Sequence, residues 1–153
     1  PNPHAFAVLK ERFLDNPRVV CINKGVAGIK DVGEAKLFLH KKAETNQVKY
    51  ASGCSILSDK HNVNADDYLS IEIIDLCEFI KNLEERVKIL KIDIEGAEVE
   101  LINDLIDQGL SNEIGYIIAE THGGKSPSLC EPTKKLVQRI KDENISNIKL
   151  DWI

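Results

Sequence analysis

The chain has 153 residues, of which 42% are hydrophobic and 29% are charged, a profile typical of one folded globular domain. Its net charge is -5 and its lysines are scattered along the chain, which argues against nucleic-acid binding. No apolar run approaches the ~20 residues that a membrane-spanning helix needs, so we expect no membrane partner. We therefore expect a single domain over residues 1–153.

The cysteines show no pattern of a metal site or of a disulfide framework. Cys21, Cys54, Cys77 and Cys130 are widely and irregularly spaced, with no CxxC pair and no histidine in a zinc-binding arrangement. This usage predicts reduced thiols and a cytoplasmic protein.

The first forty residues predict a helix followed by two strands. Asn2 is a helix-capping residue type, apolar residues recur at helical spacing over residues 3–16, and Pro17 ends the pattern. Residues 18–23, "RVVCIN", are rich in β-branched side chains and predict a short strand. After a glycine-containing turn, residues 34–42 predict a second strand.

The middle of the chain predicts an insertion before the next strand and helix. Residues 46–68 are polar and rich in glycine, serine and asparagine, which indicates either a functional loop or a β-hairpin insertion. Residues 69–75 alternate apolar and polar side chains as a strand does, and Asp75 is in position to cap the helix that follows.

The second half of the chain alternates strands with helices. Strands are predicted over residues 86–94, 114–122 and 145–153, and helices over residues 96–109 and 131–144. Parallel neighbours need crossover connections, which are usually helices. The alternation therefore predicts an α/β fold, with a mostly parallel sheet, helices on both faces and a β-rich insertion before the strand that ends in acids.

Four titratable residues follow two of the most apolar strands. Asp93 and Glu95 lie where one strand ends, and Glu120 and His122 lie at the same end of the next strand along the chain. In an open parallel sheet, ligands bind beyond the carboxyl ends of the strands. If the two strands are neighbours, these four groups meet at one rim, which predicts a functional site there.

Residues around these four have simpler explanations. Glu95 and Glu98 suit the first turn of any surface helix, because the helix dipole favours acids there, and Glu100 is expected to be solvated. Asp93 is expected to be partly buried at the end of its strand. Gly96 costs a helix about 1 kcal/mol relative to alanine, which indicates that another group approaches the backbone there. His122 has three open interpretations: a base, a ligand or an ordinary loop residue.

Residues 89–102, "ILKIDIEGAEVELI", resemble the signature of the FkbM-type methyltransferases, which are Rossmann-like enzymes that use S-adenosylmethionine. Four further segments resemble parts of that family in the same order along the chain. They are "PNPHAFAVLKERF", "CINKGVAG", "GCSIL" and "IIAETH". The resemblance spans nearly the whole chain and implies a Rossmann-like methyltransferase domain with S-adenosylmethionine as its cofactor.

The resemblance also implies roles for individual residues and a reaction. The residues implied to contact the cofactor are Asn2, Asn23, Gly25, Val26 and Asp93. The residues implied to act as catalytic groups around the reacting centre are Asp93, Glu95, Glu120 and His122. The expected reaction transfers a methyl group to a hydroxyl of a small molecule or glycan, and one of these groups accepts the hydroxyl proton.

Several ionised acids beside the sulfonium would stabilise the bound cofactor more than the transition state, so only one of them is expected to touch it. The other acids would orient the substrate or bind a metal. The methyltransferase hypothesis itself names no residue as a metal ligand.

Two features of the family pattern are not found in the 153 residues. They are the glycine-rich loop that receives the methionine part of the cofactor and the acid that holds the ribose hydroxyls. We expect both to belong to a βαβ unit of roughly 30 or more residues in front of Pro1, so that the domain is N-terminally incomplete. On this view the 153 residues alone have negligible activity, and a central strand has an unpaired edge.

Two other functions stay open. Asp93, Glu95, Glu120 and His122 are also suitable oxygen and imidazole ligands for a divalent-metal-dependent hydrolase or transferase, provided that all four reach one point. A Rossmann-like module that serves as a scaffold without catalysis is the other alternative. The sequence identifies neither the methyl acceptor nor the oligomeric state.

Overall fold

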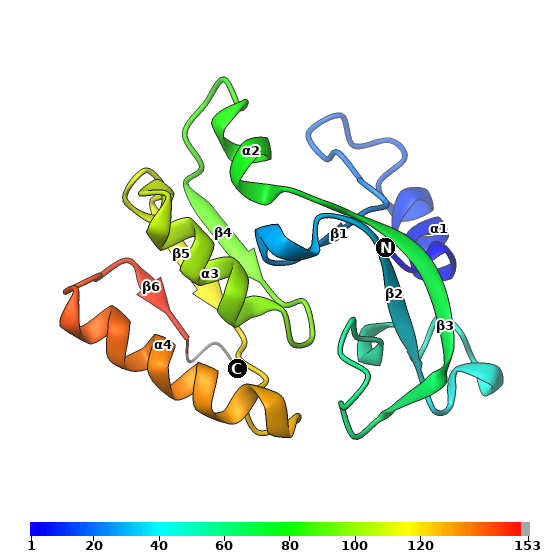
Figure 1. Ribbon diagram of the computed structural model, residues 1–153. Coiled ribbons are helices and arrows are strands. Elements are labelled where there is room, and N and C mark those ends of the chain that lie inside the picture. The colour runs from blue at the N-terminus through cyan, green and yellow to red at the C-terminus, as the bar shows by residue number, and fades with distance from the viewer. Residues whose placement is uncertain (151–153) are drawn as a thin grey trace.

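A computed structural model describes residues 1–150, which form a mixed α/β fold with parallel strands and helices (Figure 1). The helices are α1 (Pro3–Arg12), α2 (Leu76–Lys81), α3 (Glu98–Asp107) and α4 (Cys130–Asp142). The strands are β1 (Gly25–Val26), β2 (Gly33–His40), β3 (Val63–Ile74), β4 (Ile89–Ile92), β5 (Tyr116–Ala119) and β6 (Ile148–Lys149). Of the strand predicted over residues 145–153, only Ile148–Lys149 is observed as a strand, and residues 151–153 lie outside the described range.

Two features of the described residues bear on the expectations from composition. No helix within residues 1–150 is long and apolar enough to cross a membrane. The four cysteines are free thiols, as their spacing predicted.

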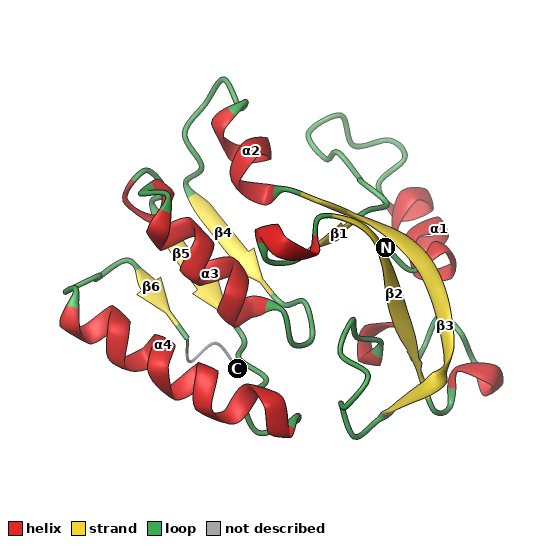
Figure 2. Ribbon diagram, viewed as in Figure 1, coloured by secondary structure: helices red, strands yellow, loops and turns green. Residues whose placement is uncertain are grey.

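The strands form two three-stranded sheets instead of one. In the first sheet, β4, β5 and β6 run parallel in that order; in the second, β3 lies between a parallel β1 and an antiparallel β2 (Figure 2). Most pairings are therefore parallel, as predicted. The strand β1 has only two residues and pairs with β3, not with β4. Within the described chain, β4 therefore pairs with β5 on one edge and with no strand on its opposite edge, and the two sheets stay separate.

The parallel sheet and its helices enclose the main hydrophobic core. The helices α3 and α4 each carry the chain from one parallel strand to the next, and Figure 1 shows α3 in front of β4 and β5. Leu101, Ile102 and Leu105 of α3 are buried in one core with Ile117 and Ala119 of β5. Burial of one large aliphatic side chain contributes about 1.5–3 kcal/mol to stability, so this core holds α3 against the parallel sheet.

The insertion before β4 is a β-hairpin with a long connection, which agrees with one of the two interpretations of this segment. The strands β2 and β3 pair from Gly33 opposite Ile73 to His40 opposite Val63. The polar residues between them form short 3-10 turns at Ala43–Thr45 and Ala51–Gly53. The inward side chains of the hairpin form a second core that also includes Ala97, the residue just before α3.

The N-terminal segment differs from its prediction in two places. Asn2 caps α1 as expected, because its side-chain oxygen accepts hydrogen bonds from the amides of His4 (3.0 Å) and Ala5 (3.4 Å). However, α1 ends at Arg12 instead of residue 16. Residues 18–23 form no strand, and the Val20 side chain is 82% exposed. A β-branched run needs a neighbouring strand to pair with, and none of the described strands lies beside this one.

Helix ends in the second half agree with the sequence, whereas the strands are shorter than predicted. Asp75 accepts a hydrogen bond from the Glu78 amide at 3.1 Å, and Gly109 follows α3 with a φ of 74°. The strands β4 and β5 cover four residues each instead of nine. The residues beyond Ile92 and Ala119 leave the sheet and form the cluster described below.

A close backbone approach at Gly115 gives the first prediction. Gly115 donates a hydrogen bond to the Val87 carbonyl at 2.9 Å, and a Cβ atom at Gly115 would lie 2.4 Å from the Lys88 carbonyl oxygen. Gly115→Ala should therefore force β4 and β5 apart where they begin and lower the free energy of unfolding by about 1–3 kcal/mol in urea titrations. Gly124→Ala is the control, because no atom lies within 4 Å of a Cβ there. Equal stability of the two variants would contradict the packing at Gly115.

Candidate functional site

The loops that follow β4 and β5 bring the four predicted catalytic residues together. The parallel register sets Ile92 opposite Ala119, so both strands end at the same edge of the sheet. The Nε2 atom of His122 lies 3.1 Å from Glu95 Oε2 and 3.6 Å from Glu120 Oε1. Ligand atoms of Asp93, Glu120 and His122 all lie within 4.8 Å of one another. These four residues are called the rim cluster below; their catalytic roles stay predictions.

Glu98 lies behind the rim cluster and was misjudged from the sequence. It was expected on a helix surface, but it is fully buried, with 0% exposure. Its Oε1 accepts hydrogen bonds from His122 Nδ1 (2.8 Å) and the Ile94 amide (3.1 Å), and its Oε2 accepts one from the Gly96 amide (3.0 Å). An acid in the first turn of a helix can reach back to the preceding backbone amides, as a capping-box glutamate does, and that signal was available in the sequence.

The backbone before Glu98 makes an unusual turn that explains Gly96. Glu95 and Gly96 have φ values of 60° and 128°, and a non-glycine residue in the left-handed region costs roughly 1–2 kcal/mol. The Ser55 hydroxyl donates to the Glu95 carbonyl at 2.6 Å, and a Cβ at Gly96 would meet Leu57 Cδ1 at 2.7 Å. The predicted approach of another group to the Gly96 backbone is confirmed, and the group comes from the insertion.

Opposite charges set the protonation states of the buried groups around His122, which are Glu95, Glu98 and Lys60. The carboxylates of Glu95 and Glu98 raise the pKa of His122 to about 9 against the effect of burial. Burial alone would raise the pKa of Glu95, but the contacts with His122 and Lys60 lower it to about 2. The Lys60 ammonium forms a buried ion pair with Glu95. At neutral pH the interior therefore holds two cations, His122 and Lys60, and two carboxylates, Glu95 and Glu98.

The other two members of the rim cluster face solvent. Asp93 was expected to be partly buried, but its side chain is 37% exposed and lies 3.2 Å from Lys91 Nζ. The chain leaves the sheet directly after Ile92, which turns this side chain outward. Glu120 has 36% exposure and lies 3.3 Å from Lys125 Nζ. Both contacts are exposed ion pairs, which contribute little to stability.

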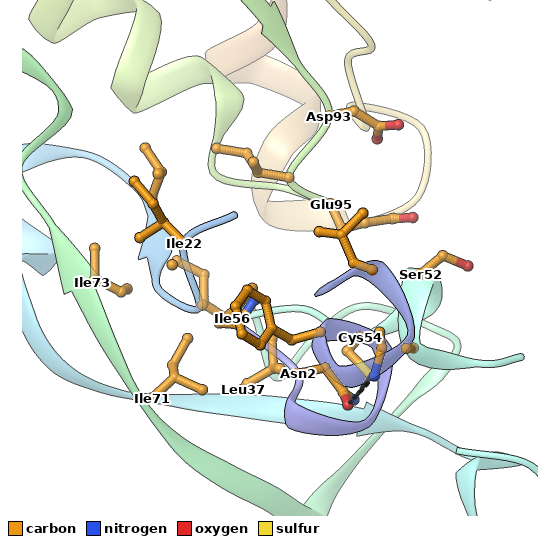
Figure 3. A pocket seen from close by; sticks show the side chains of 18 of the residues that line it. Asn2, Ile22, Leu37, Ser52, Cys54, Ile56, Ile71, Ile73, Asp93 and Glu95 are labelled. Atoms are coloured by element: carbon orange, nitrogen blue, oxygen red, sulfur yellow. Dashed lines mark hydrogen bonds between the residues drawn. The ribbon is translucent and has the colours of Figure 1, made fainter. Parts of the chain in front are cut away.

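An apolar cavity of about 440 Å³ adjoins the rim cluster. Its walls come from α1, from the hairpin and from the loop after β4. Figure 3 shows Asp93 and Glu95 at one end of the cavity, away from Leu37, Ile71 and Ile73.

Four of the five residues predicted to contact the cofactor line this cavity; they are Asn2, Gly25, Val26 and Asp93. Asn23, the fifth, is exposed and is not among the lining residues. The Asn2 side chain is occupied by its capping bonds and by a contact of 3.9 Å with Cys54 Sγ, drawn as a dashed line in Figure 3.

Comparison with known proteins gives one match. The family model described as Methyltransferase FkbM domain matches residues 1–144. That range contains every helix of the structure, the hairpin and the whole rim cluster. No curated protein and no solved structure matches the chain.

Removing the Glu98 carboxylate should destabilise the fold strongly. Glu98→Ala leaves the Ile94 and Gly96 amides and His122 Nδ1 buried without their acceptor, and we expect a loss of about 3–5 kcal/mol in the free energy of unfolding. Glu98→Gln keeps one acceptor oxygen and should lose roughly half as much. Glu100→Ala, which removes an acid with 45% exposure from the same helix, should cost less than about 1 kcal/mol. Similar losses for Glu98→Ala and Glu100→Ala in urea unfolding would contradict the burial of Glu98.

The raised pKa of His122 predicts lower stability at alkaline pH. Its folded-state pKa of about 9 exceeds its ordinary value of 6.5, so folding takes up a proton between these values. The resulting stabilisation is complete below pH 6.5 and is lost as the pH rises through 9. We expect His122→Gln to remove this decline, which amounts to roughly 3 kcal/mol at most. The measurement is urea unfolding over this pH range with a chelator present.

His4→Gln is the matched control, because His4 is exposed on α1 and lies outside the cluster. That variant should keep the alkaline decline of the parent protein. A decline that survives unchanged in His122→Gln would mean that other groups cause it.

Proposed function

The chain belongs to the FkbM methyltransferase family, and we propose that it serves S-adenosylmethionine-dependent transfer of a methyl group to a hydroxyl oxygen. One observation carries this proposal: Asp93 lines the apolar cavity and is also a member of the rim cluster. A methyl donor held in the cavity and an acceptor bound at the cluster would meet at Asp93.

The cavity suits the adenosine part of the donor in size and lining. Its volume of about 440 Å³ is within the range of small-molecule sites, and its walls are mainly aliphatic. Gly25 and Val26 offer a wall against which a flat adenine ring would pack, while Asp93 and Glu95 bring negative charge to one end. When bound, S-adenosylmethionine supplies a methyl group that its positively charged sulfur activates.

Other contacts to the donor have no counterpart in this sequence. The glycine-rich loop and the ribose-binding acid that the family resemblance implies are not found among the 153 residues.

The residues of the cluster divide the remaining tasks. Methyl transfer needs three aligned atoms in a dry setting and a group that accepts the hydroxyl proton. His122 is a poor proton acceptor, because its pKa of about 9 keeps it protonated at neutral pH, and the Glu95 carboxylate is held by Lys60. Asp93 is therefore the proposed proton acceptor, and the half-buried Glu120 is proposed to orient the acceptor molecule.

A neutral hydroxyl compound is the acceptor that fits the charges of the cluster. Asp93 and Glu120 are the partly exposed carboxylates of this rim, and as hydrogen-bond acceptors they suit the hydroxyl groups of a neutral compound. We therefore propose a small molecule or a glycan as the methyl acceptor.

The alternative of a metal-dependent hydrolase has less support. It required four ligands at one point, but the Glu95 carboxylate is paired with Lys60, which leaves Asp93, Glu120 and His122.

Asp93→Asn in the full gene product that contains these residues tests the proposed proton acceptor. Loss of the acceptor should lower kcat for methyl transfer by about 10²- to 10⁴-fold. Binding of S-adenosylhomocysteine, measured by calorimetric titration, should change less than about threefold, because this product carries no sulfonium charge. Asp66→Asn, on the exposed part of β3, is the control and should leave both quantities unchanged.

Two outcomes would contradict the proposal. One is a gene product that does not bind S-adenosylhomocysteine at millimolar concentration; the other is an unchanged kcat in Asp93→Asn.

A further inference from the structure

We propose that Asp93, Glu120 and His122 form a binding site for one divalent cation of the transition series. The three side chains come from the loops after β4 and β5 and offer two carboxylate oxygens and one imidazole nitrogen. Binding itself does not depend on the proposed methyl transfer.

The distances between the ligand atoms are close to those of a coordination sphere. The three atoms lie within 4.8 Å of one another, and His122 Nε2 lies 3.6 Å from Glu120 Oε1. Atoms that share an ion at about 2.0–2.2 Å are at most about 4.4 Å apart. A small rotation of the exposed Asp93 side chain would therefore complete the site.

The orientation of His122 is an independent observation that points to a cation. Its Nδ1 atom lies 2.8 Å from the buried Glu98 carboxylate and donates to it, so Nε2 is the ring nitrogen at which a cation can replace a proton. The His122 side chain is 1% exposed, and Nε2 has no hydrogen-bond partner within the described chain. The 3.1 Å contact with Glu95 is close enough for charge attraction but lacks the direction of a hydrogen bond.

The Glu98–His122 contact matches the arrangement around many metal-binding histidines. In such sites a carboxylate accepts the N–H of one ring nitrogen, which fixes the ring and makes the other nitrogen a better ligand. The Glu98 carboxylate accepts from Nδ1 of His122 in the same way, and its other hydrogen bonds come from the backbone amides of Ile94 and Gly96. A cation at Nε2 would take the place of the proton that otherwise occupies this lone pair.

The charged neighbours of each carboxylate show which of them can bind an ion. Glu95 is paired with the buried Lys60 and is unavailable to an ion. Asp93 is paired with Lys91 at 3.2 Å and Glu120 with Lys125 at 3.3 Å, and such exposed ion pairs open at little cost. Because Asp93 and Glu120 are partly exposed, an ion can enter from solvent on their side.

The mixed donor set selects the kind of cation. Carboxylates alone suit Mg²⁺ and Ca²⁺, whereas a neutral imidazole favours Mn²⁺, Fe²⁺ or Zn²⁺. Three protein ligands leave further coordination positions for water or for an oxygen of a bound molecule. If the proposed methyl transfer is correct, that oxygen would be the acceptor hydroxyl, and the Asp93 oxygen that does not bind the ion would accept its proton.

Calorimetric titration of the metal-free gene product with MnCl₂ tests the site. We expect one Mn²⁺ per chain and at least about tenfold weaker binding of Mg²⁺. Asp93→Asn and Glu120→Gln are substitutions of partly exposed side chains and should each weaken Mn²⁺ binding by at least about tenfold. Glu98→Gln should weaken it by about 10- to 100-fold through the histidine.

The matched control is Glu100→Gln, because Glu100 belongs to another acidic group, with Asp31 and Asp104 near Lys30. It should leave Mn²⁺ binding unchanged. Pulsed electron paramagnetic resonance gives a second measurement: the bound Mn²⁺ should show coupling to an imidazole nitrogen, and this coupling should be lost in His122→Gln.

The proposal is wrong if no Mn²⁺ binds at millimolar concentration, or if Asp93→Asn and Glu120→Gln bind it as tightly as the parent protein. Loss of S-adenosylhomocysteine binding with intact Mn²⁺ binding would contradict the proposed function and leave the cation site standing.

Discussion

The site depends on the contact between the buried carboxylate of Glu98 and the imidazole of His122. It joins the first turn of α3 to the loop after β5, at 2.8 Å and with almost no exposure of either side chain. A buried carboxylate is costly unless every polar atom around it is paired. Glu98 meets this condition through the Ile94 and Gly96 amides and the imidazole, so its position dictates the path of the backbone from β4 to α3.

The insertion completes this arrangement from the other side. Ser55 bonds the Glu95 carbonyl, Leu57 fills the space beside Gly96, and Lys60 neutralises the Glu95 carboxylate. The hairpin and the parallel sheet, which share no strand pairing, are thereby held together at one turn. The apolar cavity lies where these parts meet, and for this reason its acidic end and the rim cluster share Asp93.

The sequence predicted the element types and the convergence of the rim cluster, because apolar periodicity and strand alternation are local signals. Asp75 and Asn2 were recognisable as caps for the same reason. The division into two sheets was not predictable, because strand pairing depends on which segments become neighbours. Residues 18–23 show this limit: their β-branched pattern is that of a strand, but no described strand lies beside them.

Burial of charge was the least predictable property of the site. Glu98 and Asp93 are both acids near the end of the same strand, yet the first is fully buried and the second is 37% exposed. The difference comes from three-dimensional partners, two amides and an imidazole 24 residues away, which residue type alone does not reveal. Lys60 was missed for the same reason, since a lysine in a polar loop gives no sign that it will be 3% exposed.

Nuclear magnetic resonance of the His122 ring tests the central contact most directly. In ¹⁵N-labelled, metal-free protein at neutral pH, the account predicts a slowly exchanging Nδ1 proton with a nuclear Overhauser contact to the Gly96 amide proton, since both donate to Glu98. A ring whose N–H protons exchange too fast to detect, with no contact to Gly96, would show that Glu98 and His122 are apart and would contradict the account.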